Sequence, residues 1–141
     1  MKKQFMMKLF LNIIFMFFLS NIAYSAEFKD GVTHISQQEF MQKITEENVV
    51  VIDVRTEKEY RSAHIEGAIN LPHKSILADP SLLEPYFEKD MIFHCHSGVR
   101  AKIITDYLIE SGLQKNQLKL FHLKGDMRAW RARNLPLVRD K

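Results

Sequence analysis

One short stretch of the sequence combines a nucleophile, a glycine and a cation at a spacing that could do chemistry. Cys95, the single cysteine of the chain, follows a short apolar run, and four residues separate it from Arg100, with Gly98 among them. Apolar residues then recur at helical spacing, so the pattern predicts a strand, a tight loop and a helix. Loop N–H groups and the positive end of a helix favour an anion. The stretch therefore predicts a reactive Cys95 thiolate, assisted by Arg100, in a loop partly open to substrate; the alternative is an inert buried thiol.

The elements around this stretch alternate between strands and helices. A β-branched run at 49–54 is typical of a central parallel strand, and Ser36 to Glu39 has the spacing of a capping box. This alternation predicts an α/β fold, with a mainly parallel sheet of about five strands and helices on both faces. Ligands of such sheets bind at the carboxyl ends of the strands, where Cys95 falls. The expected strands are 32–35, 49–54, 68–71, 91–94 and 118–123, and the expected helices are 37–45, 57–62, 80–87, 99–111 and 126–133.

The loop resembles the active-site loop of the rhodanese-like family, in which cysteine, four residues and arginine follow one another with an inner glycine. The resemblance extends over about residues 32–136, and its further motifs stand in the family's order. They are the Asp-x-Arg strand end at 51–55 with Glu59 and Tyr60 after it, the His-Ile-x-Gly-Ala-x-Asn stretch at 64–70, and the closing Leu-x-Gly segment at 123–126 with Trp130, where Asp126 replaces the second glycine of the family pattern.

The resemblance implies a sulfurtransferase without a metal or an organic cofactor. A sulfane sulfur would pass from a small anionic donor such as thiosulfate, through a Cys95 persulfide, to a cyanide, thiol or protein acceptor. Two other functions stay open: a persulfide carrier or binding module that serves a protein partner, and a cysteine phosphatase. Phosphatase loops have five intervening residues rather than four, so the spacing favours a cradle for one sulfur atom. The implied substrate-binding residues are His96, Ser97, Gly98, Val99 and Arg100.

Two charged residues at a predicted strand end, Asp53 and Arg55, could support the pocket. A structural alternative is equally open: Arg55 would pair with Glu59, and Asp53 would cap a turn. His94 and His96 flank Cys95 and would share one strand face, which raises the question of a metal site. The other histidines lack zinc-ligand spacing, so no metal is predicted, and His96 is expected in the loop. We expect His64 to be structural and Trp130 to lie in the core.

The N-terminus has the order of a secretory signal, with lysines, an apolar run and then small residues before Ala26. The apolar run spans about eleven residues, fewer than the ~18 of a membrane span. We therefore expect residues 1–25 to be removed and the protein to be exported to the periplasm, or secreted where there is no outer membrane. Residues 26–141 are then expected to form one domain, with no membrane span left after processing. The alternative is an uncleaved anchor.

The net charge gives no support to nucleic-acid binding. The chain is formally +3, with 20 basic and 17 acidic residues, and Lys2, Lys3 and Lys8 of the predicted signal account for the excess. The processed chain is therefore near neutral, and its remaining basic cluster lies close to the C-terminus. No nucleic-acid partner is therefore predicted.

Overall fold

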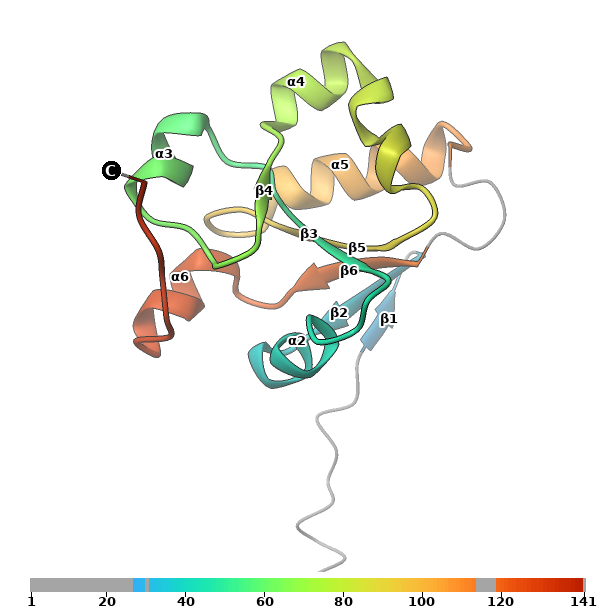
Figure 1. Ribbon diagram of the computed structural model, residues 1–141. Helices are drawn as coiled ribbons and strands as arrows, with labels where there is room; N and C mark the ends of the chain where they lie inside the picture. The colour runs from blue at the N-terminus through green and yellow to red at the C-terminus, as the bar shows by residue number, and fades with distance from the viewer. Residues whose placement is uncertain (1–26, 30, 114–118, 141) are drawn as a thin grey trace, which may run out of the picture.

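A mostly parallel sheet lies at the centre of the computed structural model, which describes residues 27–29, 31–113 and 119–140 (Figure 1). Five strands in the order β2-β6-β5-β3-β4 are parallel, and β1 joins β2 antiparallel at one edge. The predicted α/β fold is therefore confirmed. The predicted signal segment lies outside the described residues. The strands are β1 (Glu27–Lys29), β2 (Val32–Ile35), β3 (Val49–Asp53), β4 (Ile69–Asn70), β5 (Asp90–His94) and β6 (Leu120–Leu123).

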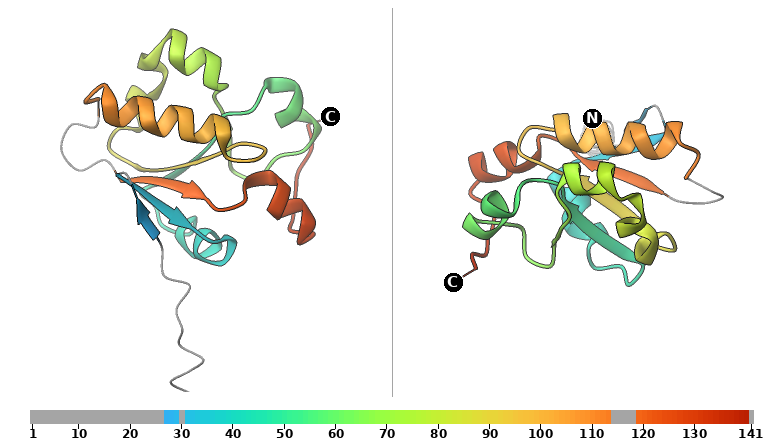
Figure 2. Two further views of the ribbon diagram at one scale, coloured as in Figure 1. Left: turned by 180° about the vertical axis from the view of Figure 1, so that it is seen from behind. Right: turned by 90° about the horizontal axis from the view of Figure 1, so that it is seen from above.

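Helices cover both faces of the sheet, as Figures 1 and 2 show. The helices α4 and α5 and the 3₁₀ helix η1 pack on one face, and α2 and α6 pack on the other. In the part of the chain that the structure describes, no helix has the length and apolar character needed to cross a bilayer. The helices are α2 (Gln37–Lys43), α3 (Glu57–Ser62), α4 (His73–Ala78), η1 (Pro80–Tyr86), α5 (Val99–Glu110) and α6 (Asp126–Ala132).

The strand that leads to Cys95 is buried on both faces. Met91 and Phe93 of β5 pack in the core beneath α4 and α5, whereas Ile92 packs in the core that contains Trp130. Met91, Ile92 and Phe93 are each 0% exposed, and burial of one such side chain contributes about 1.5–3 kcal/mol. A continuous apolar run is what a parallel strand covered on both faces requires. Packing on both faces thus fixes the position of β5 and, with it, the position of Cys95 directly after the strand.

Several local signals of the sequence are confirmed. Ser36 and Glu39 form the predicted capping box, with Glu39 N donating to Ser36 Oγ at 3.2 Å. The Asp79 side chain caps the helix predicted at 80–87 by accepting from Ser81 N at 3.1 Å. That helix is 3₁₀ rather than α, and it contains Pro85, which cannot donate to an α-helical ladder.

Two elements, α4 and β1, were not predicted. α4 has no side-chain cap and buries only Ile76, so the sequence contains neither a cap nor an apolar stripe that would predict this helix. β1 is three residues long, directly after the predicted signal segment, and it is held by antiparallel pairing with β2. Short elements of this kind depend on tertiary contacts more than on local pattern.

The carboxyl ends of β3, β5 and β6 lie at one end of the molecule, beside α3, α6 and the loop between β5 and α5 (Figures 1 and 2). The chain that follows α6 is fastened to the same region by an antiparallel bridge between His64 and Val138. Trp130 Nε1 also donates to Pro136 O at 2.9 Å. Segments far apart in the sequence therefore meet around the predicted site.

Candidate active site

Cys95 follows β5 directly and begins the loop that leads into α5, so the predicted strand, loop and helix are all present. Gly98 N donates a hydrogen bond to Cys95 Sγ at 3.1 Å. Gly98 has φ +96°, in the left-handed region that glycine enters most easily, and α5 begins at the next residue. The turn at Gly98 thus aims a backbone donor at the sulfur atom.

The first residues of α6 hold the Cys95 backbone from the opposite side. Cys95 N donates to Asp126 Oδ1 at 2.7 Å, and Met127 N donates to Cys95 O at 3.1 Å. Arg128 N donates to His96 O at 3.0 Å. Cys95 is consequently 1% exposed, so the expectation that the strand end would be partly open at this residue was wrong. His96 and the next residue, Ser97, are exposed, so the outer part of the loop does face solvent.

Arg100 is bound to a carboxylate of α3. Its Nη1 and Nη2 donate to the two oxygens of Glu59 at 2.7 and 2.9 Å. The hydrogen bond with Glu59 is the main cause that raises the pKa of Arg100, and the Cys95 sulfur adds to this rise. The same hydrogen bond lowers the pKa of Glu59 well below its usual range, with help from Thr56. Arg100 therefore ties the start of α5 to α3.

Asp53 and Arg55 form a buried pair at the end of β3. Arg55 Nε and Nη2 donate to Asp53 Oδ2 at 2.9 and 2.6 Å, and Nη2 also donates to Ala63 O at 2.8 Å. Arg55 N donates to Asp53 Oδ1 at 3.0 Å, which is the capped turn that the structural alternative predicted. The suggested pairing of Arg55 with Glu59 was wrong, because Glu59 is bound to Arg100. The pair braces β3 against the end of α3.

The histidines beside Cys95 lie in different environments. His94 is 0% exposed, its ring nitrogens make no hydrogen bond among the described residues, and Nε2 lies 3.9 Å from Asp53 Oδ2. Burial lowers the pKa of His94, which favours the neutral ring. His94 and the exposed His96 therefore do not share a strand face as expected. In the ranges that the structure describes, no three histidine, cysteine or acidic side chains gather in a way that could hold a metal ion.

Two more predicted structural residues have clear packing. The His64 ring stacks on Tyr60 with centroids 3.8 Å apart, and its Nδ1 lies 3.0 Å from Tyr60 O. Trp130 is 2% exposed and packs edge-on against Phe40, with ring centroids 5.3 Å apart.

Val99 lies at the far end of the predicted substrate-binding loop and is 65% exposed. Its position on the first turn of α5 leaves it free to contact a bound molecule.

His122 and Asp126 received no role from the sequence, yet they lie directly behind the Cys95 loop. His122 Nε2 is 3.1 Å from Asp126 Oδ2, and the other carboxylate oxygen accepts from Cys95 N. Asp126 has φ +51° and is 1% exposed. The signal that pointed to it was its place in the family pattern, where an aspartate stands instead of a glycine.

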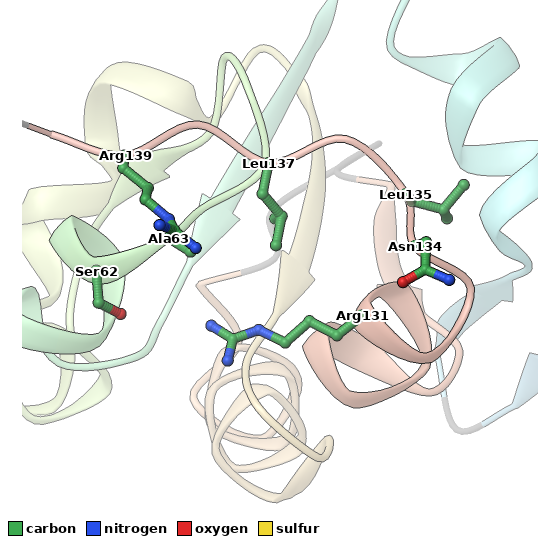
Figure 3. A pocket seen from close by; sticks show the side chains of 7 residues that line it. All are labelled: Ser62, Ala63, Arg131, Asn134, Leu135, Leu137 and Arg139. Atoms are coloured by element: carbon green, nitrogen blue, oxygen red, sulfur yellow. The ribbon is translucent and has the colours of Figure 1, made fainter.

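A pocket of about 570 Å³ lies between the end of α3 and the segment after α6 (Figure 3). Arg131 and Arg139 extend toward it from α6 and from the C-terminal segment. None of its lining residues belongs to the predicted site, so this pocket is separate from the Cys95 loop. The lining residues are Ser62, Ala63, Arg131, Asn134, Leu135, Leu137 and Arg139.

Comparison with known proteins agrees with the predicted fold. The rhodanese-like domain family matches residues 36–133. The chain belongs to this family. A protein of Escherichia coli described as uncharacterized protein YibN is 33% identical over 108 residues, which cover 76% of this chain and 73% of YibN. The thiosulfate sulfurtransferase GlpE of Pseudoalteromonas translucida is 27% identical over 99 residues, which cover 70% of this chain and 89% of GlpE.

A solved structure shows the same fold. The rhodanese-related protein of Thermoplasma volcanium superposes with a TM-score of 0.62 at 24% identity, covering 74% of this chain and 96% of that protein. The rhodanese-like domain of the present chain therefore includes the whole strand, loop and helix that hold Cys95.

Proposed function

We propose that this rhodanese-like protein is a sulfurtransferase that carries sulfane sulfur on Cys95. The observation that supports the proposal most is the placement of the one cysteine of the chain at the carboxyl end of β5, with Gly98 N aimed at its sulfur. The similarity to a thiosulfate sulfurtransferase adds to this support. The donor is a small anion such as thiosulfate, and the acceptor is cyanide, a thiol or a thiol on a protein.

The reaction takes place in two steps on one sulfur atom. The Cys95 thiolate attacks the outer sulfur of thiosulfate, the bond between the two sulfurs of the donor breaks, and sulfite leaves with the electron pair. Cys95 is then a persulfide. The acceptor attacks the outer sulfur, the sulfur–sulfur bond to Cys95 breaks, and the thiolate returns. With cyanide the product is thiocyanate, and no external oxidant or reductant is needed.

The loop residues have distinct parts in this chemistry. Gly98 N donates a hydrogen bond to the Cys95 sulfur at 3.1 Å and so holds the sulfur at the turn. Arg100 contributes a positive charge beside the sulfur while its guanidinium group is held by Glu59. The exposed His96, Ser97 and Val99 are the residues that an incoming donor meets first. Asp53 and Arg55 hold the end of β3 next to β5.

Intact-mass measurement tests the proposal directly. Purified protein treated with thiosulfate is expected to gain the mass of one sulfur atom, because the chain has one cysteine to carry it. Later treatment with cyanide should remove that mass and release an equal amount of thiocyanate. Protein that gains no sulfur from thiosulfate or from an alkyl persulfide donor would refute the proposal.

Gly98→Ala is expected to slow sulfur transfer by about a hundredfold, since small displacements of reacting groups have effects of this size. A side chain at φ +96° costs roughly 1–2 kcal/mol, and its Cβ would lie 3.0 Å from Asp126 Oδ2 and 3.3 Å from His122 Cε1. The turn must shift, and the N–H donor to Cys95 shifts with it. Steady-state thiosulfate:cyanide assays measure the change.

Gly112→Ala is the matched control for this variant. Gly112 also has a positive φ, +65°, but a Cβ there meets nothing within 4 Å. It should lose a similar amount of backbone stability and keep its sulfur-transfer rate. Equal rates for the two variants would show that the turn at Gly98 is not needed.

We further propose that the protein is exported and that residues 1–25 are its signal peptide. The support is the order of lysines, apolar run and small residues at the N-terminus. Expression of the full chain in a Gram-negative host is expected to give periplasmic protein that begins at Ala26 or Glu27, as N-terminal sequencing would show. Protein recovered from the cytoplasm with its N-terminus intact would contradict this.

A further inference from the structure

A buried carboxylate lies behind the Cys95 loop, and both of its oxygens are engaged. Asp126 is 1% exposed; Oδ1 accepts from Cys95 N at 2.7 Å, and Oδ2 lies 3.1 Å from His122 Nε2. A buried carboxylate without such partners would be costly, so the two contacts account for its presence there. The Cys95 N–H is thereby used by Asp126 and does not face the sulfur of its own residue.

The Asp126 side chain also lies close to the turn at the other end of the loop. A Cβ on Gly98 would lie 3.0 Å from Asp126 Oδ2, so this oxygen sits directly under the turn that supplies an N–H to Cys95 Sγ. His122 packs beneath the same turn, with Cε1 3.3 Å from that point. Asp126 therefore touches the loop where it begins, at Cys95, and supports it where it turns, at Gly98.

The backbone of Asp126 is adapted to this contact. Its φ of +51° is in the left-handed region, which aspartate tolerates better than most residues with a side chain. This conformation precedes Met127, whose N–H holds Cys95 O at 3.1 Å. Both backbone polar groups of Cys95 are consequently held by two consecutive residues at the start of α6.

Charge stabilisation does not explain a carboxylate at this place. A negative charge does not assist a neighbouring thiolate, so charge alone gives no reason for an aspartate here. What the carboxylate supplies is geometry: a hydrogen-bond acceptor for Cys95 N and a support under Gly98. This distinction separates two substitutions, because asparagine keeps the acceptor and removes the charge, whereas glycine removes both.

We propose that Asp126, held by His122, is a positioning residue for sulfur transfer that fixes the Cys95 loop against α6. This inference rests on the proposed sulfurtransferase function. Asp126 is not expected to contact the donor or the acceptor, since Cys95 lies between it and the exposed face of the loop. It acts through the backbone of Cys95 and through the turn at Gly98.

The test compares Asp126→Gly with Asp126→Asn in single-turnover persulfide formation from saturating thiosulfate. Asp126→Gly relieves the backbone strain at φ +51° but removes the side-chain contacts that hold the Cys95 loop. We therefore expect persulfide formation to slow about a hundredfold. In Asp126→Asn, the amide oxygen can accept from Cys95 N, and the amide nitrogen can donate to His122 when the His122 ring adopts its other tautomer. The rate of this variant should therefore stay within about threefold of the native rate or exceed it. Rescue by asparagine is the result that a general loss of stability would not give.

Asn134→Gly is the matched control. Asn134 has φ +52°, nearly the same as Asp126, and it lies after α6 in an exposed position. This substitution makes the same backbone change without touching the Cys95 loop, so persulfide formation should be unaffected. A rate for Asp126→Gly within twofold of that of Asn134→Gly would overturn the inference, as would equal slowing in Asp126→Gly and Asp126→Asn.

Amide hydrogen exchange at Cys95 gives a readout that does not depend on sulfur chemistry. A hydrogen bond to a charged group is worth about 1.5–3 kcal/mol, so Asp126→Gly should raise exchange at this amide about tenfold to a hundredfold. The amide of Ile92, within β5, should not change. If the native protein forms no persulfide, the sulfurtransferase proposal fails, and this measurement still decides whether Asp126 holds Cys95. If Asp126→Gly does not fold, the native protein and Asp126→Asn decide the question. An unprotected Cys95 amide in the native protein overturns the inference. Strong protection there that is partly lost in Asp126→Asn supports it, because a neutral amide oxygen accepts a weaker hydrogen bond than a carboxylate, and unchanged protection in Asp126→Asn counts against it.

Discussion

Cys95→Ser is expected to leave the fold intact and to slow thiosulfate:cyanide sulfur transfer by at least about 10⁴-fold, as removal of a covalent nucleophile does in other enzymes. The chain has no second cysteine that could carry the sulfur. A serine hydroxyl is a far weaker nucleophile at neutral pH, and it cannot form a persulfide. The hydroxyl can accept the Gly98 N–H that Cys95 Sγ accepts now, so the loop keeps this contact.

Three measurements separate loss of chemistry from loss of structure. Intact mass after thiosulfate should show no added sulfur on Cys95→Ser. The free energy of unfolding should fall by less than about 2 kcal/mol, because the buried hydroxyl keeps a hydrogen-bond partner. Cys95→Ala, which has no hydroxyl, should be equally inactive. Sulfur transfer that persists in either variant would place the chemistry at another residue.

The parts of the site that the sequence predicted are those with local signals. The apolar run before Cys95, the glycine in the loop and the helical spacing after it are all contained within about twenty residues, and such patterns determine local structure. The strand, the turn at Gly98 and α5 were therefore predictable. The capping box at Ser36 acts over three residues and was predicted for the same reason.

The contacts that hold the loop in place join residues far apart in the sequence. Asp126 is 31 positions from Cys95, and Glu59 is 41 positions from Arg100. No periodicity links such pairs, so the sequence alone left Arg55 as an equal candidate partner for Glu59. The burial of Cys95 has the same origin, because it results from the packing of α6 against the loop. Tertiary contacts of this kind, rather than local sequence patterns, decide which charged residues pair with each other.

Asp53→Ala is expected to be among the most destabilising single substitutions outside the apolar core. Asp53 and Arg55 are 0% and 1% exposed, and their ion pair measures 2.6 Å. Removal of the carboxylate leaves a buried guanidinium whose one remaining acceptor is Ala63 O among the described residues. Breaking a buried pair in this way costs about 3–5 kcal/mol, a large part of the 5–15 kcal/mol that stabilises a typical domain. Urea unfolding should show a lower midpoint with an unchanged slope.

The cause of this loss is the unpaired charge, and the double variant Asp53→Ala/Arg55→Met tests that cause. Methionine fills much of the space of the arginine stem without burying a charge, so the double variant should be more stable than Asp53→Ala alone. Glu57→Ala is the matched control, because its ion pair with Arg61 is exposed, with side chains 67% and 66% accessible. Loss of an exposed pair should change the free energy of unfolding by less than about 1 kcal/mol. A double variant no more stable than Asp53→Ala would mean that the cavity, rather than the unpaired guanidinium, accounts for the cost.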